Sequence, residues 1–168
     1  MRRGRRRGID QPEPGGWLEH VRLGFNYRLS DIAAALGIGQ LERLDEILAR
    51  RSEAASRYAE LLGPVEELEL PAADDADHRR SWFVYVVLFP DTAARERVVA
   101  AFEREGIGYN RYLPSLHLQP YLRERFGFGE GVCPVAEDAS SRSLALPFFT
   151  GIEAAAQERV AEVLASAL

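Results

Sequence analysis

Apolar residues recur at helical spacing along the chain between positions 32 and 62. This period predicts a long amphipathic helix, because positions three and four residues apart fall on one helix face. Such a face has to be covered, so we expect it to form core or an interface and not to carry chemistry. The positions that define the period are Ile32, Leu36, Leu41, Leu44, Ile47, Leu48, Tyr58, Leu61 and Leu62.

The ends of this helix are marked by residues with strong local preferences. Ser30 has a typical N-cap side chain, and Asp31 puts a carboxylate in the first turn, where the helix dipole favours it. Gly37 and Gly39 are expected to kink or divide the helix, since glycine is a poor helix former. Gly63-Pro64 ends it.

Strand and helix patterns alternate after this helix. A polar acidic loop covers residues 72–80, and the β-branched and aromatic stretch that follows predicts a buried strand. Strand, helix and strand again imply an α+β domain with a small sheet covered by helices. Three segments result: an irregular Arg/Gly/Pro-rich lead-in at 1–23, a loop and long helix at 24–63, and a small α+β domain at 64–168. The expected strands are 82–89, 107–112 and 144–146, and the expected helices are 92–105, 118–126, 135–143 and 152–168.

The chain contains no lysine, and all 21 of its positive side chains are arginines. A GC-rich genome explains that bias most simply, yet imine formation needs a primary amine that only lysine supplies among side chains. The net charge of −5 argues against a nucleic-acid binder, and no apolar run approaches the length of a membrane span. Cys133 alone can form neither an internal disulfide nor a zinc site, which fits a reducing cytoplasm; we assign no metal site, and no role to His20 or His78.

Residues 29–38 resemble the first helix and turn of a helix-turn-helix. In that alternative the next helix would lie in the major groove of DNA, aided by the arginine-rich start of the chain. The next helix, however, mixes Glu42, Asp45, Glu46 and Glu53 with its arginines, which is typical of a solvated, salt-bridged face. DNA binding is therefore a remote alternative.

Four motifs in order resemble the sugar-nucleotide aminotransferases of the DegT/DnrJ/StrS family. The first is Gly24-Phe25-Asn26-Tyr27-Arg28-Leu29-Ser30-Asp31, which runs into Ala34-Ala35-Leu36-Gly37 and Gln40-Leu41-Glu42-Arg43-Leu44. The second runs from Gly106 through Arg111-Tyr112-Leu113-Pro114-Ser115-Leu116-His117 to Tyr121 and looks like the family's substrate loop. Cys133-Pro134-Val135-Ala136-Glu137 and Leu144-Ala145-Leu146-Pro147-Phe148-Phe149 follow at the family's spacing, so the likeness extends from about Gly15 onward.

This resemblance implies a fold type I enzyme that uses pyridoxal phosphate to aminate a keto-sugar nucleotide in amino-sugar biosynthesis. It also implies glutamate as the amino donor, a homodimeric enzyme and a cytoplasmic location. Family members are roughly twice as long, and the part preceding this segment holds the lysine that forms the aldimine. The resemblance therefore predicts the C-terminal part of such an enzyme, which holds no cofactor covalently and is inactive alone. The alternative is a non-catalytic folding or dimerisation fragment.

Five residues are candidates for the site. By resemblance, Asn26 reaches the cofactor phosphate of a neighbouring subunit; otherwise its amide would form an Asx-turn. Arg28 suits a phosphate or carboxylate, but an ion pair with Asp31 is an equal alternative. By resemblance His117 contacts the sugar nucleotide, with Arg111 and Tyr112 as weaker candidates for the same surface; the alternative for His117 is a loop-stabilising histidine. Some family members have a histidine within the segment occupied by residues 111–113, so the sugar specificity stays open.

Overall fold

The computed structural model describes residues 3–4, 22–23, 29–75, 77–78 and 80–168. It divides into two compact units, Met1–Arg43 and Leu44–Leu168. Asn26 and Arg28, two of the candidate site residues, lie outside the described residues, as does His20. No helix in the described ranges has both the length and the apolar character that crossing a membrane requires.

In the first unit, the two-residue strands β1 (Arg3–Gly4) and β2 (Arg22–Leu23) pair antiparallel within the segment expected to be irregular. Helix α1 (Asp31–Leu41) follows, and the Ser30 hydroxyl accepts the Ala33 N–H at 3.2 Å, which confirms the N-cap. The two glycines do not divide the helix, because Gly37 and Gly39 both lie inside it. The break comes at residues 42–43, where the Arg43 N–H donates to the Gln40 carbonyl at 3.2 Å, an i→i−3 turn.

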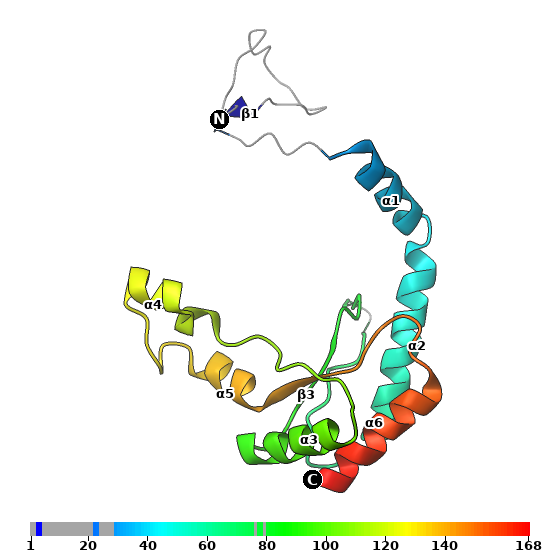
Figure 1. The fold of residues 1–168 in the computed structure, drawn as a ribbon, viewed down its shortest axis with the longest axis vertical. Helices are drawn as coiled ribbons and strands as arrows, with labels where there is room; N and C mark the ends of the chain where they lie inside the picture. Colours follow the sequence, from blue (N-terminus) through cyan, green and yellow to red (C-terminus); the bar gives the residue numbers. More distant parts are fainter. Residues whose placement is uncertain (1–2, 5–21, 24–28, 76, 79) are drawn as a thin grey trace. The chain divides into compact units, whose positions relative to one another are not determined.

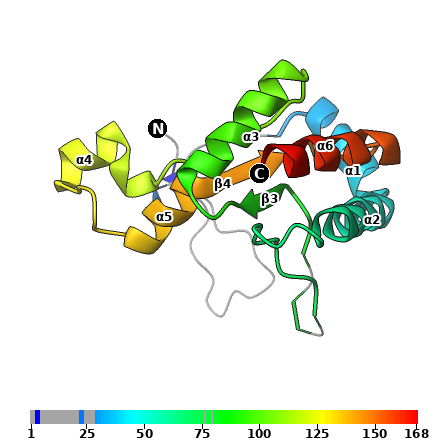
Figure 2. The same ribbon diagram turned by 90° about the horizontal axis from the view of Figure 1, so that it is seen from below.

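The second unit is an α+β arrangement, as predicted (Figures 1 and 2). Its elements in chain order are α2 (Leu44–Leu62), β3 (Tyr85–Leu88), α3 (Thr92–Arg104), the 3₁₀ turn η1 (Leu116–Leu118), α4 (Pro120–Phe126), α5 (Pro134–Arg142), β4 (Ser143–Leu146) and α6 (Ala154–Ala167).

Strands β3 and β4 pair antiparallel, and one face of this sheet carries the core. Tyr85 lies opposite Leu146 and Val87 opposite Leu144, and all four side chains are buried beneath α2, α3 and α6. Because side chains alternate along a strand, the other face is left to Val86 and Leu88 of β3 and to Val84 just before it. The position of that second face decides where the candidate site lies.

The prediction of a strand at 107–112 is wrong. This segment joins the sheet through a single antiparallel bridge, between Asn110 and Ala145 on the free edge of β4. A second single bridge, Glu69 to Leu88, lies on the free edge of β3. Residues 107–112 have strand-like composition, but the segment runs beside β4 for one bridge only, so no ladder forms.

Helix α3 begins and ends at the residues that local chemistry indicates. The Asp91 carboxylate accepts the Ala94 N–H at 2.7 Å, a side-chain N-cap. Past its last turn Gly106 takes a φ of +66°, a left-handed conformation that glycine adopts without steric cost. Both signals were expected at these positions.

Helix α2 belongs with the second unit through its contacts with α6. The fully buried Gln157 of α6 donates from Nε2 to the Ala54 carbonyl at 2.8 Å and accepts from Arg57 Nη1 at 2.7 Å. The compact units divide between Arg43 and Leu44. The three segments expected from the sequence, 1–23, 24–63 and 64–168, stay a prediction.

Candidate functional site

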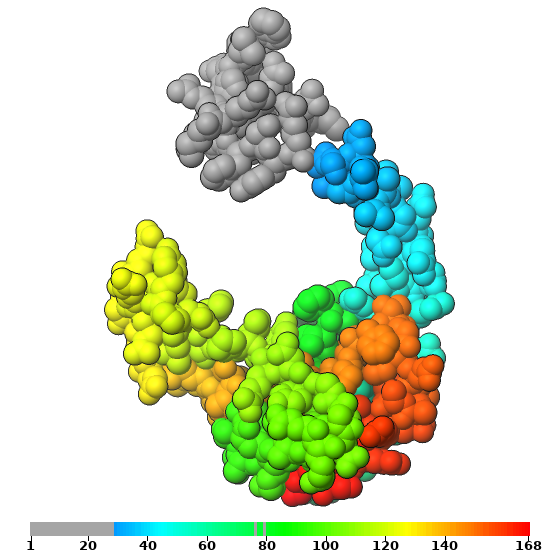
Figure 3. Space-filling model, in the orientation of Figure 1, coloured from blue at the N-terminus to red at the C-terminus, as the bar shows by residue number. Residues whose placement is uncertain are grey.

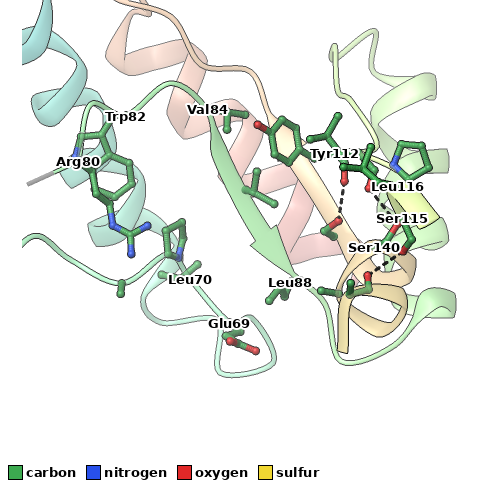
Figure 4. Close-up of a pocket in the computed structure, with 18 residues that line it drawn as sticks. Glu69, Leu70, Arg80, Trp82, Val84, Leu88, Tyr112, Ser115, Leu116 and Ser140 are labelled. Carbon is green, nitrogen blue, oxygen red and sulfur yellow. Dashed lines mark hydrogen bonds between the residues drawn. The ribbon is translucent and has the colours of Figure 1, made fainter. Parts of the chain in front are cut away.

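An open groove of about 660 Å³ lies against the second face of the sheet, within the second unit (Figure 4). We call it the β3 groove. Val84, Val86 and Leu88 form its floor, so the strand that buries one set of side chains in the core presents the alternate set here. The remaining lining residues are Glu69, Leu70, Pro71, Ala72, Arg80, Trp82, Tyr112, Leu113, Pro114, Ser115, Leu116, Ala136, Ala139, Ser140 and Ser143.

One wall of the groove is a loop fastened by serine hydroxyls. Ser143 donates to the Tyr112 carbonyl at 3.4 Å, Ser140 to the Leu113 carbonyl at 3.1 Å, and Ser115 to the Ala136 carbonyl at 3.1 Å. These bonds tie residues 112–115 to α5 and β4. They also hold Leu113 at a φ of +43°, a left-handed conformation that costs a branched side chain on the order of 1–3 kcal/mol.

The opposite wall carries a second residue in the left-handed region. Trp82 has a φ of +48°; its ring stacks on Tyr85 at 5.9 Å between centroids, and the Arg80 guanidinium carbon lies 5.5 Å from the ring centroid. Neither Trp82 nor Arg80 was singled out from the sequence, where Trp82 read as the start of a strand. A backbone dihedral of this kind leaves no sequence signal when the residue is not glycine.

The groove combines apolar walls with few polar groups, which is the usual composition of small-molecule sites. Glu69 and Arg80 carry its charges, and the Tyr112 ring projects toward it from the serine-held wall (Figure 4). Trp82 and Leu113, the two residues with positive φ, both line it, and such strain is concentrated at functional sites. Among the described residues, no group of three or more His, Cys, Asp or Glu side chains could hold a metal ion.

The three described candidates from the sequence fall in different environments. Tyr112 is half-buried and lines the groove. Arg111 is exposed and pairs with Glu96 of α3, which also pairs with Arg95. The hydrogen bond from Arg95, and with it the nearby Arg111, holds the pKa of Glu96 below its usual value. His117 is buried away from the groove lining. The structure therefore does not bring these three side chains into one site.

His117 lies in a contact that closes the loop between η1 and α5. Its Nε2 is 2.8 Å from the Glu137 carboxylate, and the same carboxylate accepts the N–H groups of Gly131 at 2.9 Å and Cys133 at 3.1 Å. The α4 segment between these anchors projects from the rest of the second unit (Figure 3). The geometry matches the loop-stabilising alternative for His117.

We expect Glu137→Gln to loosen this loop. The Gly131 N–H, and with it His117 and Cys133, keep the pKa of Glu137 below its ordinary 4.5, so the ionised carboxylate is the form that the fold prefers. Its stabilising contribution is present above pH 4.5 and is lost as pH falls through the lowered pKa. Amide exchange at Gly131 and Cys133 should accelerate about tenfold or more in the variant at neutral pH. Unchanged exchange, with Asp138→Asn as the control on the same helix, would contradict this.

A profile of the DegT/DnrJ/EryC1/StrS aminotransferase family matches residues 1–165. The spore coat polysaccharide biosynthesis protein SpsC of Bacillus subtilis (strain 168) is 33% identical over 140 residues, covering 80% of this chain and 36% of SpsC. The aminotransferase TlmJ of Streptoalloteichus hindustanus superposes with a TM-score of 0.76 at 29% identity, covering 89% of this chain and 39% of TlmJ.

The DesV protein of S. venezuelae, solved in complex with a ketimine intermediate, gives a TM-score of 0.78 at 26% identity and the same coverage, 89% and 39%. The chain thus spans about two-fifths of the length of the relatives that it matches. The family profile covers nearly the whole chain, and the chain belongs to the DegT/DnrJ/EryC1/StrS aminotransferase family.

Proposed function

We propose that this chain forms the substrate-facing part of a pyridoxal-phosphate-dependent aminotransferase that aminates a keto-sugar nucleotide, with glutamate as amino donor. The observation that carries the proposal is the family match over residues 1–165. Its similarity to SpsC, a spore coat polysaccharide biosynthesis protein, and to DesV, solved with a ketimine intermediate, supports it. We also propose that the intact enzyme is a homodimer and is located in the cytoplasm.

The residues of this chain do not fit covalent attachment of the cofactor. Pyridoxal phosphate, when bound, supplies the electron sink and carries the amino group, and it is held through a lysine amine. None of the 168 residues is a lysine. We therefore derive no chemical step within this chain and propose that the lysine comes from a further domain or polypeptide.

The roles left to this chain are binding and positioning. We propose that the Asn26 amide donates to the cofactor phosphate and that the Arg28 guanidinium binds a phosphate or carboxylate, as the family motif implies. Tyr112 is the candidate that the groove supports, and the neighbouring Arg111 would act at its rim. For His117 we propose a positioning role, because its contact with Glu137 holds the loop that follows Tyr112.

The first test is spectroscopic. The chain alone, mixed with pyridoxal phosphate, should show no visible absorbance of an internal aldimine, because it lacks the amine that forms one. Fusing the SpsC segment that this chain does not match should restore the band and transamination of a keto-sugar nucleotide. An aldimine band from the chain alone would overturn the claim of inactivity. A fusion protein that shows the aldimine band but does not transaminate would favour the non-catalytic alternative.

The second test concerns Tyr112 in that fusion. Tyr112→Ala removes a ring that lines the groove, so KM for the sugar nucleotide should rise about tenfold or more while the aldimine absorbance stays. Tyr121→Ala is the matched control, since Tyr121 is 62% exposed on α4 and lies outside the groove lining. Equal effects of the two substitutions would remove the groove from the proposed site.

A further inference from the structure

The backbone around Tyr112 is held on both sides. The carbonyl of Leu113, the next residue, accepts the Ser140 hydroxyl at 3.1 Å (Figure 4). The guanidinium of Arg111, the preceding residue, donates to the Glu96 carboxylate at 2.5 Å. The side chain of Tyr112 lines the β3 groove between these two held positions.

Both contacts lead back to Arg95 of α3. Nη1 of Arg95 donates to the Ser140 carbonyl at 3.3 Å, and Nη2 donates to the Glu96 carboxylate at 2.6 Å. One guanidinium is therefore connected to Leu113 through Ser140 and to Arg111 through Glu96. A guanidinium can hold two partners in a fixed geometry, because its donors form a rigid planar fork.

The position of Arg95 suits a residue that holds others in place. It is 9% exposed and belongs to α3, in which Val98 and Phe102 are fully buried in the core. Charged side chains are rarely buried unless their donors are paired, and those of Arg95 are. Neither Arg95 nor Glu96 lines the groove. The pair can therefore affect a bound ligand only through the residues that it holds.

The backbone conformation of Leu113 depends on this support. Its φ of +43° would suit glycine, yet the leucine side chain is 61% exposed, so burial of that side chain does not hold it there. A strained conformation persists only where surrounding contacts determine it. The hydrogen bond from Ser140 is such a contact, and it acts on the residue that follows Tyr112 directly.

We propose that Arg95 and Ser140 are positioning residues that hold Tyr112 against the sugar nucleotide in the β3 groove. This rests on the proposed function, which takes the groove as the sugar-nucleotide site. Arg95 acts through Ser140 and Glu96, and Ser140 acts through the backbone of Leu113. Loosening either residue weakens binding of the sugar nucleotide and leaves the chemical step unchanged.

The experiment measures KM and kcat in the fusion with the SpsC segment, with a uridine diphosphate-linked ketohexose as the probe. Ser140→Ala and Arg95→Lys should each raise KM about threefold or more and leave kcat within about twofold, because a lost hydrogen bond loosens Tyr112 away from the reacting atoms. Ser140→Thr keeps the hydroxyl and should restore the parent KM. Ser141→Ala is the matched control, since the Ser141 hydroxyl donates to the Asp138 carbonyl within α5.

The same substitutions are then made in Tyr112→Ala. If Ser140 and Arg95 act through Tyr112, they should raise KM less than about twofold once its ring is gone. A merely structural role would lower stability equally in both backgrounds and would not make KM depend on Tyr112. Full, additive rises in the Tyr112→Ala background would overturn the proposal, as would an unchanged KM in Ser140→Ala and Arg95→Lys.

A second measurement does not depend on the proposed function. In this chain alone, the backbone order parameters of Tyr112 and Leu113 from NMR relaxation should fall from about 0.85 to below about 0.6 in Ser140→Ala and Arg95→Lys, but not in Ser141→Ala. Order parameters that stay at the parent level in all three variants would overturn the positioning. A fusion that does not transaminate, together with the expected fall in order, would refute the proposed function and support the hold on Tyr112.

Discussion

Phe102→Ala is expected to lower the free energy of unfolding of the second unit by about 3–5 kcal/mol. Phe102 lies in α3 with its ring fully buried, tilted against Tyr109 at 6.5 Å between centroids. Truncation removes the buried ring and leaves a cavity between α3 and the sheet, because close-packed surroundings relax only in part. Urea denaturation followed by circular dichroism measures the loss.

Phe149→Ala is the matched control for this substitution. The side chain of Phe149 is 57% exposed, so the same change should cost less than about 1 kcal/mol. Comparable losses for the two variants would mean that the core does not lie between α3 and the sheet. A large loss for Phe149→Ala alone would place an unrecognised contact on that side of the unit.

The core substitution also bears on the candidate site, because the groove is the reverse side of the same sheet. Val87 and Leu144 are buried on the core face, and the neighbouring Val86 and Ser143 line the β3 groove. A strand that shifts to fill a cavity on one face moves the groove floor on the other. Loss of sugar-nucleotide binding in the fused enzyme should therefore accompany loss of stability in Phe102→Ala.

The features that the sequence predicted are those set by a few neighbouring residues. Asp91 caps α3 through an amide three positions away, and Gly106 ends it through its own φ. A strand, Tyr85–Leu88, also forms within the stretch whose β-branched and aromatic composition predicted one. Such features need no information about the rest of the chain, since the physical cause lies within one turn.

The features that it missed depend on distant partners. Residues 107–112 have strand-like composition, but whether they pair is decided by the free edge of β4, and only Asn110 bridges it. The contact of His117 Nε2 with the Glu137 carboxylate at 2.8 Å joins residues twenty positions apart. The strained dihedrals of Trp82 and Leu113 are imposed by packing and by hydrogen bonds such as that from Ser140. Asn26 and Arg28, predicted by resemblance, stay predictions.

Tyr58→Phe and Tyr85→Phe should have different effects although both rings are fully buried in contact with each other. The Tyr58 hydroxyl donates to the Pro147 carbonyl at 2.8 Å, so its removal should cost about 1–2 kcal/mol. The Tyr85 hydroxyl is buried without a hydrogen-bond partner among the described residues. Removing this hydroxyl breaks no hydrogen bond and leaves no polar group unpaired. The free energy of unfolding of Tyr85→Phe should therefore lie within about 0.5 kcal/mol of the parent or exceed it.

The same pair predicts how the fold fails in alkali. Burial raises the pKa of Tyr85 to about 12. The pKa of Tyr58 is raised further, by burial first and then by the nearby Tyr85. In the unfolded chain both hydroxyls titrate near the ordinary value of 10. The folded state therefore retains protons that the unfolded state releases, and the free energy of unfolding falls as pH rises from 10 toward 12. Each Phe variant removes one such group and should flatten the fall over that window, as urea titrations at pH 8 to 12 can measure. The contrary result would be equal destabilisation of both variants at neutral pH, with a free energy of unfolding that falls as steeply with pH as that of the parent. The two hydroxyls would then have to be solvated, and the aromatic core beneath β3 would be more open than the packing of Tyr58 on Tyr85 implies.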